Sequence, residues 1–303
     1  MSRDYAVFCK SFRDDFPRLG NLIKSWEKHG SGIPMLLSVP RSDIGLLYES
    51  FEIPAGVWVI SDESYVGSSE HSPYGWMHQQ ICKLAVYRTR FADSYYLIDS
   101  DSYFVSDLTT GDFVDGQGQL RIVASPLSTR YSSNNPLLHK YLGDESVVAN
   151  ATPFPELERE IFLRNLAKAR ADHKADPSLV AGDRRKYIGE VFTKDGTYNN
   201  PLNWGPNPIF HSEILFSMEV DIKEVGMNLR DLIYLAPWEY EWYAYYSMQR
   251  YSGPIVPSVS SCVHFAKDTD VEFAKESGVS TDILARRFKA VAMASRHFDL
   301  AEF

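Results

Sequence analysis

"YYLIDSDSYF", residues 95–104, is the stretch that decides the fold. An apolar and aromatic run of strand length ends on two aspartates, Asp99 and Asp101, with one serine between them. Carboxylates two residues apart point roughly the same way if the chain stays extended, and keeping both ionised costs repulsion. The stretch therefore predicts a buried strand with a functional group at its carboxyl end.

Segments of strand length and helix length alternate upstream of this stretch. Three short apolar runs closed by polar residues or proline are expected as strands: 5–11, 33–40 and 56–63. Three segments with apolar residues at helical spacing follow these strands in turn and are expected as helices: 13–30, 41–51 and 75–91. This order predicts an α/β fold, in which a mainly parallel central sheet has helices on both faces.

The second half of the chain is less regular. We expect a strand near 120–127, an amphipathic helix over 153–175, a loop rich in Pro, Asn and Gly over 198–210, a helix from 237 and a late strand near 258–266. No internal repeat or low-complexity linker separates the halves. We therefore expect one compact domain, with residues 1–110 ending in the acidic pair and residues 111–303 forming the less regular half.

Composition excludes several classes of protein. The net charge of −9 over 303 residues, with no basic stripe, disfavours a nucleic-acid partner. No apolar run reaches the ~18–20 residues that span a bilayer, and the N-terminus lacks the features of a signal peptide. Cys9, Cys82 and Cys262 form no C-x-x-C motif. A cytoplasmic protein without a transmembrane segment is expected.

A divalent cation would relieve the repulsion between Asp99 and Asp101. Mg²⁺ and Mn²⁺ prefer oxygen ligands, and Mg²⁺ commonly takes one or two carboxylates together with substrate phosphates. Such a cation would neutralise charge on a departing diphosphate. The alternative is that the two aspartates only cap a turn through their own backbone.

The motif set resembles the type-A (GT-A) glycosyltransferases. The resemblance rests on "CKSF" (9–12), "SVP" (38–40), "GWMHQQICKL" (75–84) and "YYLIDSDSYF" (95–104), and it is closest to a largely uncharacterised bacterial group with a G-W-x-x-Q-Q-x-x-K-L helix before its D-S-D. It implies a GT-A fold, a nucleotide-sugar donor (UDP-, GDP- or CMP-linked) bound in the half formed by 1–110, and an acceptor bound in the half formed by 111–303.

The resemblance and the residue types together give a set of expected site residues. Asp99 and Asp101 are the expected ligands of Mn²⁺ or Mg²⁺, and His264 resembles the late histidine that completes this metal site in several GT-A enzymes. The expected donor-binding residues are Lys10, Ser11, Asp62, Gln80, Lys83 and Ser100. The expected acceptor-binding residues are Asn203, Trp204 and Trp238. The alternative for Gln80 and Lys83 is that they are solvated side chains on a surface helix and bind no ligand.

Glu239 and Glu241 are the two expected candidates for the catalytic base. Both fall in the first turn of an expected helix, where an acid also stabilises the helix dipole without any catalytic role. Nearby aromatic residues would raise a carboxylate pKa by desolvation, as a general base requires. The expected reaction is sugar transfer to a hydroxyl of a glycan or lipid-linked glycan in surface polysaccharide or lipopolysaccharide synthesis, with peripheral membrane contact left open.

Two other functions stay open at this point. A haloacid-dehalogenase-like phosphatase would use Asp99 as nucleophile, although its D-x-D lies on an early strand and three strand–helix units precede this one. A non-catalytic carbohydrate-binding protein is supported by the aromatic content of 14%.

Overall fold

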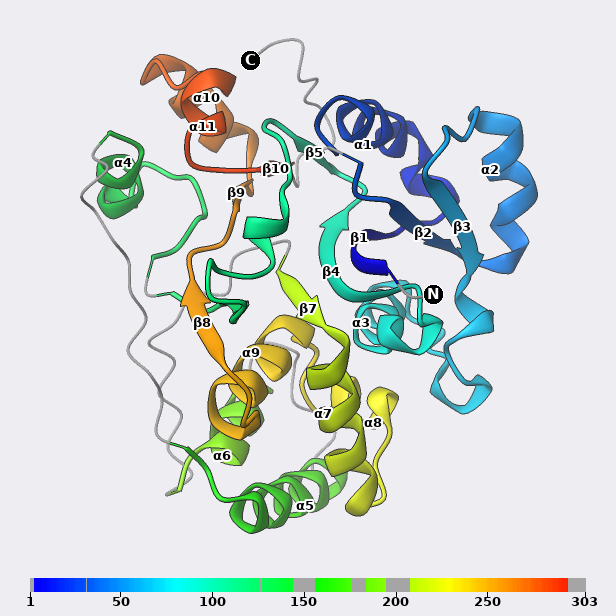
Figure 1. Cartoon of the computed structure of the whole chain (residues 1–303). Helices are drawn as coiled ribbons and strands as arrows, with labels where there is room; N and C mark the ends of the chain where they lie inside the picture. The colour runs from blue at the N-terminus through cyan, green and yellow to red at the C-terminus, as the bar shows by residue number, and fades with distance from the viewer. Residues whose placement is uncertain are drawn as a thin grey trace.

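The computed structural model describes residues 3–30, 32–125, 127–143, 156–175, 184–194 and 208–293. Its centre is a five-stranded sheet of order β3-β2-β1-β4-β7 (Figure 1). The strands are β1 (Arg3–Lys10), β2 (Met35–Val39), β3 (Val57–Ser61), β4 (Ala92–Asp99) and β7 (Ile209–His211). The first four run parallel, and β7 is antiparallel to β4. The predicted mainly parallel α/β sheet is confirmed.

Helices cover both faces of this sheet. On one face lie α1 (Phe16–His29) and α2 (Ile44–Ser50); on the other lie α3 (Gly75–Ala85), α7 (Ser212–Glu224) and α9 (Glu239–Arg250). Successive residues of β1 alternate between the two cores: Val7 packs in the cluster that contains α1, and Phe8 in the cluster that contains α3. Burial on both faces explains why these strands are continuously apolar rather than alternating.

Helix α3 is buried on more sides than its sequence indicates. Ile81, Leu84 and Ala85, which are among the apolar residues at helical spacing in this segment, are fully buried. Gln80 and Lys83 are also buried, with exposed fractions of 2% and 4%. The alternative of a solvated Lys83 on a surface helix is therefore wrong.

Two smaller sheets extend the molecule beyond the end of β4. One has the order β5-β10-β9 and the other pairs β6 with β8. Their strands are β5 (Ser102–Phe104), β10 (Ala290–Met293), β9 (Cys262–Phe265), β6 (Leu120–Val123) and β8 (Ile255–Ser258). Ala292 pairs with Ser102 on one side and with His264 on the other, so β10 brings His264 toward the end of β4.

The remaining helices pack around these sheets (Figure 1). They are α4 (Pro136–Gly143), α5 (Arg159–Ala175), α6 (Arg185–Phe192), α8 (Leu229–Leu235), α10 (Asp268–Glu276) and α11 (Thr281–Ala285). The helices expected over 153–175 and from 237 correspond to α5 and α9, and the late strand is β9. Ile209 and Phe210, expected in a loop, belong instead to β7, where they pair with Tyr96 and Tyr95. Among the described helices, none has the length and apolarity needed to cross a membrane.

Candidate functional site

The candidate site lies where the order of the central sheet reverses. From β1 the chain builds β2 and β3 on one side, and β4 then returns to the opposite side of β1. Lys10, the last residue of β1, is the register partner of Asp99, the last residue of β4. In open parallel sheets, ligands bind outside the carboxyl ends of strands at such a reversal. The structure thus brings the expected residues of β1 and β4 to one point.

Lys83 links two of the expected acids at this point. Its Nζ lies 2.8 Å from Asp99 Oδ1 and 3.1 Å from Glu239 Oε1, and it donates a hydrogen bond to the Tyr240 hydroxyl at 2.5 Å. Burial alone would lower the pKa of Lys83, but Asp99, Tyr240 and Glu239 outweigh that effect and raise it well above its usual value. The lysine is therefore an ammonium ion that joins α3, β4 and α9.

Glu239 occupies the more buried end of this ion-pair chain. Burial raises the pKa of Glu239, and Lys83 opposes that rise. The Glu239 backbone N–H donates to Gln80 Oε1 at 3.3 Å, so Gln80 supports the first turn of α9. An amide that the sequence did not single out, Gln79, donates to Asp99 Oδ1 at 2.8 Å. The signal for it was available, because Gln79 and Lys83 are spaced i, i+4 and share a helix face.

Asp101 lies beside this chain with less compensation for its charge. Its carboxylate is 27% exposed, and its nearest cation is Arg18, with 3.8 Å between Nη1 and Oδ2. Burial, together with repulsion from Asp99, raises the pKa of Asp101 to about 7. Ser100, between the two aspartates, is buried in the turn. An excess of negative charge held at a strand end is an environment that a divalent cation would stabilise, so these two carboxylates fit one.

His264 lies close enough to Asp99 for the charge of that carboxylate to affect the pKa of the imidazole. Burial, followed by repulsion from Arg130, lowers the pKa of His264, while Asp99 acts in the opposite direction. Asp99, Asp101 and His264 nevertheless do not bring three ligand atoms within 4.8 Å of one another; over the described ranges, only Asp62, His78 and Cys82 do so. The structure gathers the three expected metal ligands at one edge without forming a closed coordination shell.

In the cluster of Asp62, His78 and Cys82, the Asp62 carboxylate is held by an ion pair and by hydrogen bonds from neighbouring side chains. Lys10 Nζ lies 3.1 Å from Asp62 Oδ2, and Ser38 donates to Asp62 Oδ1 at 2.6 Å. Burial would raise the pKa of Asp62, but hydrogen bonds from His78 and Ser38 and the charge of Lys10 lower it. Since an ammonium already neutralises this carboxylate, a metal ion there would face a buried like charge.

Lys10 and Asp62, both expected to bind the donor, instead form an ion pair with each other. Both are almost fully buried, with exposed fractions of 5% and 1%. Lys10 also donates to the carbonyl oxygen of Ser11 at 2.6 Å. The Ser11 hydroxyl itself is buried, and no group in the described residues hydrogen-bonds to it. In this arrangement Lys10 and Asp62 fix the end of β1, and Ser11 keeps an unused hydrogen-bonding group.

Glu241, two residues beyond Glu239, belongs to a different group of contacts. Arg185 Nη2 lies 2.8 Å from its Oε1, and the Arg185 guanidinium stacks 3.9 Å above the Trp238 ring. Trp238 in turn meets Trp76 edge to face, with 5.7 Å between ring centroids. Burial raises the pKa of Glu241 to about 7, with Arg185 opposing and Glu239 adding to the rise. Asn203 and Trp204 lie outside the described residues.

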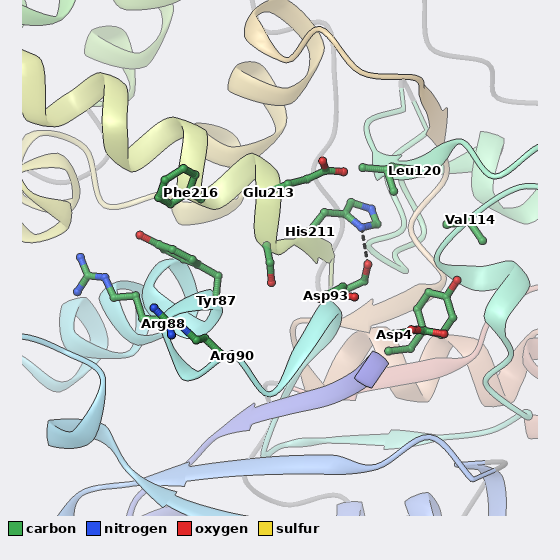
Figure 2. A pocket seen from close by; sticks show the side chains of 13 residues that line it. Asp4, Tyr87, Arg88, Arg90, Asp93, Val114, Leu120, His211, Glu213 and Phe216 are labelled. Carbon is green, nitrogen blue, oxygen red and sulfur yellow. Dashed lines mark hydrogen bonds between the residues drawn. The ribbon is translucent and has the colours of Figure 1, made fainter. Parts of the chain in front are cut away.

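A separate cavity of about 810 Å³ lies at the amino ends of the parallel strands, opposite the candidate site (Figure 2). It lies between the starts of β1 and β4 and the start of α7, and Asp4, Arg90, Asp93 and Phe216 are among its lining residues. At its wall Ser94 and His211 hydrogen-bond to each other at 2.8 Å, and His211 Nε2 contacts the Arg121 carbonyl oxygen at 3.1 Å. The expected site residues do not line this cavity.

Two solved structures that resemble this chain are distant in sequence. No protein-family model and no curated protein sequence matches the chain. The structure titled "WbbM bifunctional glycosytransferase apo structure" is 13% identical with a TM-score of 0.48, covering 98% of this chain and 46% of that one. S. aureus TarS is 10% identical with a TM-score of 0.35, covering 72% of this chain and 30% of its own. The chain thus spans less than half the length of either of these solved chains.

Proposed function

We propose that this protein is a metal-dependent glycosyltransferase that moves a sugar from a nucleotide-sugar donor to a hydroxyl group of a glycan or lipid-linked glycan. The observation that carries the proposal is the ion-pair chain Asp99–Lys83–Glu239 at the point where the sheet order reverses. In this chain one buried ammonium lies between two acids. Transfer from a phosphate-activated donor is accelerated by stabilisation of charge on the departing phosphate and by a base that accepts the acceptor's proton.

The donor's phosphates would lie at the carboxyl ends of β1 and β4. Asp101 and Asp99 would hold Mn²⁺ or Mg²⁺ there, with His264 as a further ligand, and the bound cation would stabilise negative charge on the departing phosphate. Ser11 offers its unpartnered hydroxyl to the donor, and Arg18 lies within reach of Asp101. Lys83 fixes the orientation of Asp99.

We assign the general base to Glu239 rather than Glu241. Glu239 shares Lys83 with Asp99, so it lies beside the proposed donor site, and its raised pKa makes it a better proton acceptor. Glu239 would take the proton from the acceptor hydroxyl as that oxygen bonds to the anomeric carbon and the bond from that carbon to the phosphate oxygen breaks. Direct attack of this kind inverts the anomeric centre.

Thermal unfolding with UDP, GDP or CMP, each with and without Mn²⁺, tests the proposal. At least one nucleotide should raise the melting temperature in a Mn²⁺-dependent way, and Asp101→Ala should abolish the Mn²⁺-dependent part. An equal shift in Asp101→Ala would contradict the metal site. Turnover of p-nitrophenyl phosphate with Mg²⁺, lost in Asp99→Asn, would instead favour the phosphatase.

A further inference from the structure

Among the described residues, several polar atoms next to the proposed base are buried without a hydrogen bond. They are Gln80 Nε2, Trp238 Nε1, Arg185 Nε and Glu241 Oε2, whereas Glu241 Oε1 pairs with Arg185 Nη2 at 2.8 Å. Gln80 and Glu241 are each only 2% exposed. Buried donors and acceptors are nearly always paired, so a group of orphans on neighbouring side chains points to a partner that binds there.

These orphan atoms belong to one connected set of side chains. Arg185 touches both Glu241 and Trp238, Trp238 meets Trp76, and Gln80 holds the backbone of Glu239. Helices α3, α6 and α9 each contribute to it, so the set is fixed by packing rather than by a single loop. It also adjoins the acid that we assign as base, because Trp238 precedes Glu239 directly in sequence.

Two aromatic side chains at the N-terminus of α3 are exposed. Trp76 is 50% exposed and Tyr74 is 64% exposed, although both directly precede the buried residues of α3. Trp76 lies one helical turn before Gln79, which contacts Asp99. The exposed indole therefore stands next to the proposed reaction centre, where an apolar side chain would otherwise be expected to pack inward.

We propose that Trp76, Trp238, Glu241 and Gln80 form the acceptor subsite, and that its ligand is a pyranose ring stacked on Trp76. This assignment rests on the proposed function and names the acceptor as a sugar rather than a lipid alcohol or a peptide hydroxyl. The apolar face of a sugar matches an indole face, while its hydroxyls supply both the donors and the acceptors that the orphan atoms lack. A lipid alcohol would leave most of those atoms unpaired.

The experiment uses ¹⁹F NMR of the full chain labelled with 5-fluorotryptophan, which gives one resonance for each of six tryptophans. Single Trp→Phe variants assign the resonances. The probes are the methyl glycosides of glucose, galactose, mannose, N-acetylglucosamine and rhamnose, added without nucleotide or metal. At least one should shift the Trp76 and Trp238 resonances. Trp58, which is 52% exposed but lies on β3, should not move.

Variants then test which side chains carry the binding. Trp76→Ala should weaken glycoside binding about threefold to tenfold, the range expected for loss of one aromatic stacking partner. Glu241→Gln, which keeps the size of the side chain, should weaken it as well. Trp58→Ala is the matched control and should leave the dissociation constant unchanged.

Two results separate this inference from the proposed function. If nucleotide and Mn²⁺ stabilise the protein but no glycoside moves the Trp76 resonance, the acceptor subsite is wrong and the transferase stands. If a glycoside binds at Trp76 while no nucleotide stabilises the protein, the sugar subsite is correct and the transferase fails. Binding that persists unchanged in Trp76→Ala overturns the assignment whichever outcome holds for the nucleotide.

Discussion

Lys83 Nζ lies 2.8 Å from Asp99 Oδ1, so the first acid of the D-S-D sequence already carries a positive partner supplied by the protein. Within the part of the chain that the structure describes, the cationic partner of Asp101 is Arg18, at 3.8 Å. The two acids are therefore not equivalent: Asp99 is held in place by the fold, and Asp101 carries the charge that remains to be neutralised.

Replacing Asp101 should stabilise the protein in the absence of metal. The folded pKa of about 7 lies above the usual value of an aspartate, so the folded state loses stability as pH rises from about 4 toward 7 and the carboxyl ionises. Asp101→Asn removes that loss. Its melting temperature without metal should exceed that of the parent near pH 8 and match it near pH 4. A lower melting temperature near pH 8 would contradict the assigned charge excess.

The same ionisation should control the effect of metal. Since a carboxylate ligand must be deprotonated, the Mn²⁺-dependent rise in melting temperature should grow as pH increases through about 7 in the parent protein. In Asp101→Asn the effect should be small throughout. A rise in melting temperature that is constant with pH would exclude Asp101 as a ligand.

Removing the charge of Lys83 should be costly for folding. Lys83→Met would leave Asp99 and the buried Glu239 close together without a cation, and breaking a buried ion pair in this way costs about 3–5 kcal/mol. Urea unfolding would measure the loss, and the double variant Lys83→Met/Glu239→Gln should recover part of it. Lys168→Met, at an exposed pair with Asp172, is the control and should change stability by less than about 1 kcal/mol.

Glu239 and Glu241 should separate kinetically once the donor is known. Glu239→Gln should lower kcat by about 10²–10⁴, the usual contribution of a general base, while nucleotide binding persists. Glu241→Gln should mainly raise the KM for the acceptor. Nucleotide release measured against acceptor concentration distinguishes the two effects. An equal loss of kcat in both variants would contradict the assignment of the general base to Glu239 alone.

The cluster of Asp62, His78 and Cys82 should not bind a metal ion. Lys10 already neutralises Asp62, and burial raises the pKa of Cys82 well above its usual value, which keeps the thiol protonated. Cobalt(II) added to the folded protein should therefore give no thiolate charge-transfer absorption. A band that disappears in Cys82→Ser and persists in Cys9→Ser would show that the cluster is a metal site after all.

The sequence predicted the parallel strands of the central sheet, because their apolar pattern follows directly from their burial in the fold. Strands β1, β2 and β4 are apolar over most of their length because both of their faces are buried, and that pattern is visible without coordinates. Strand β7 was not predicted, because its three residues lie beside a Pro- and Asn-rich segment and take their conformation from pairing with β4. Short edge strands depend on tertiary contacts more than on their own composition.

The site was predictable as a set of residue types but not as a set of partners. Asp99, Lys83 and Glu239 were each expected in it, yet nothing in the sequence indicates that one ammonium serves both acids. Gln79 and Arg185 were missed for the same reason, because an amide or guanidinium becomes informative only when its partner is known. Helix periodicity also gave Lys83 an exposed alternative, which the packing of α9 against α3 removes.

Lys83 and Glu239 are separated by 156 residues in the chain. Contacts between such distant segments form late, since the entropy of closing a long loop must be met before they contribute. The proposed centre is therefore incomplete until the segment that carries Glu239 has packed against α3 and brought this acid to Lys83.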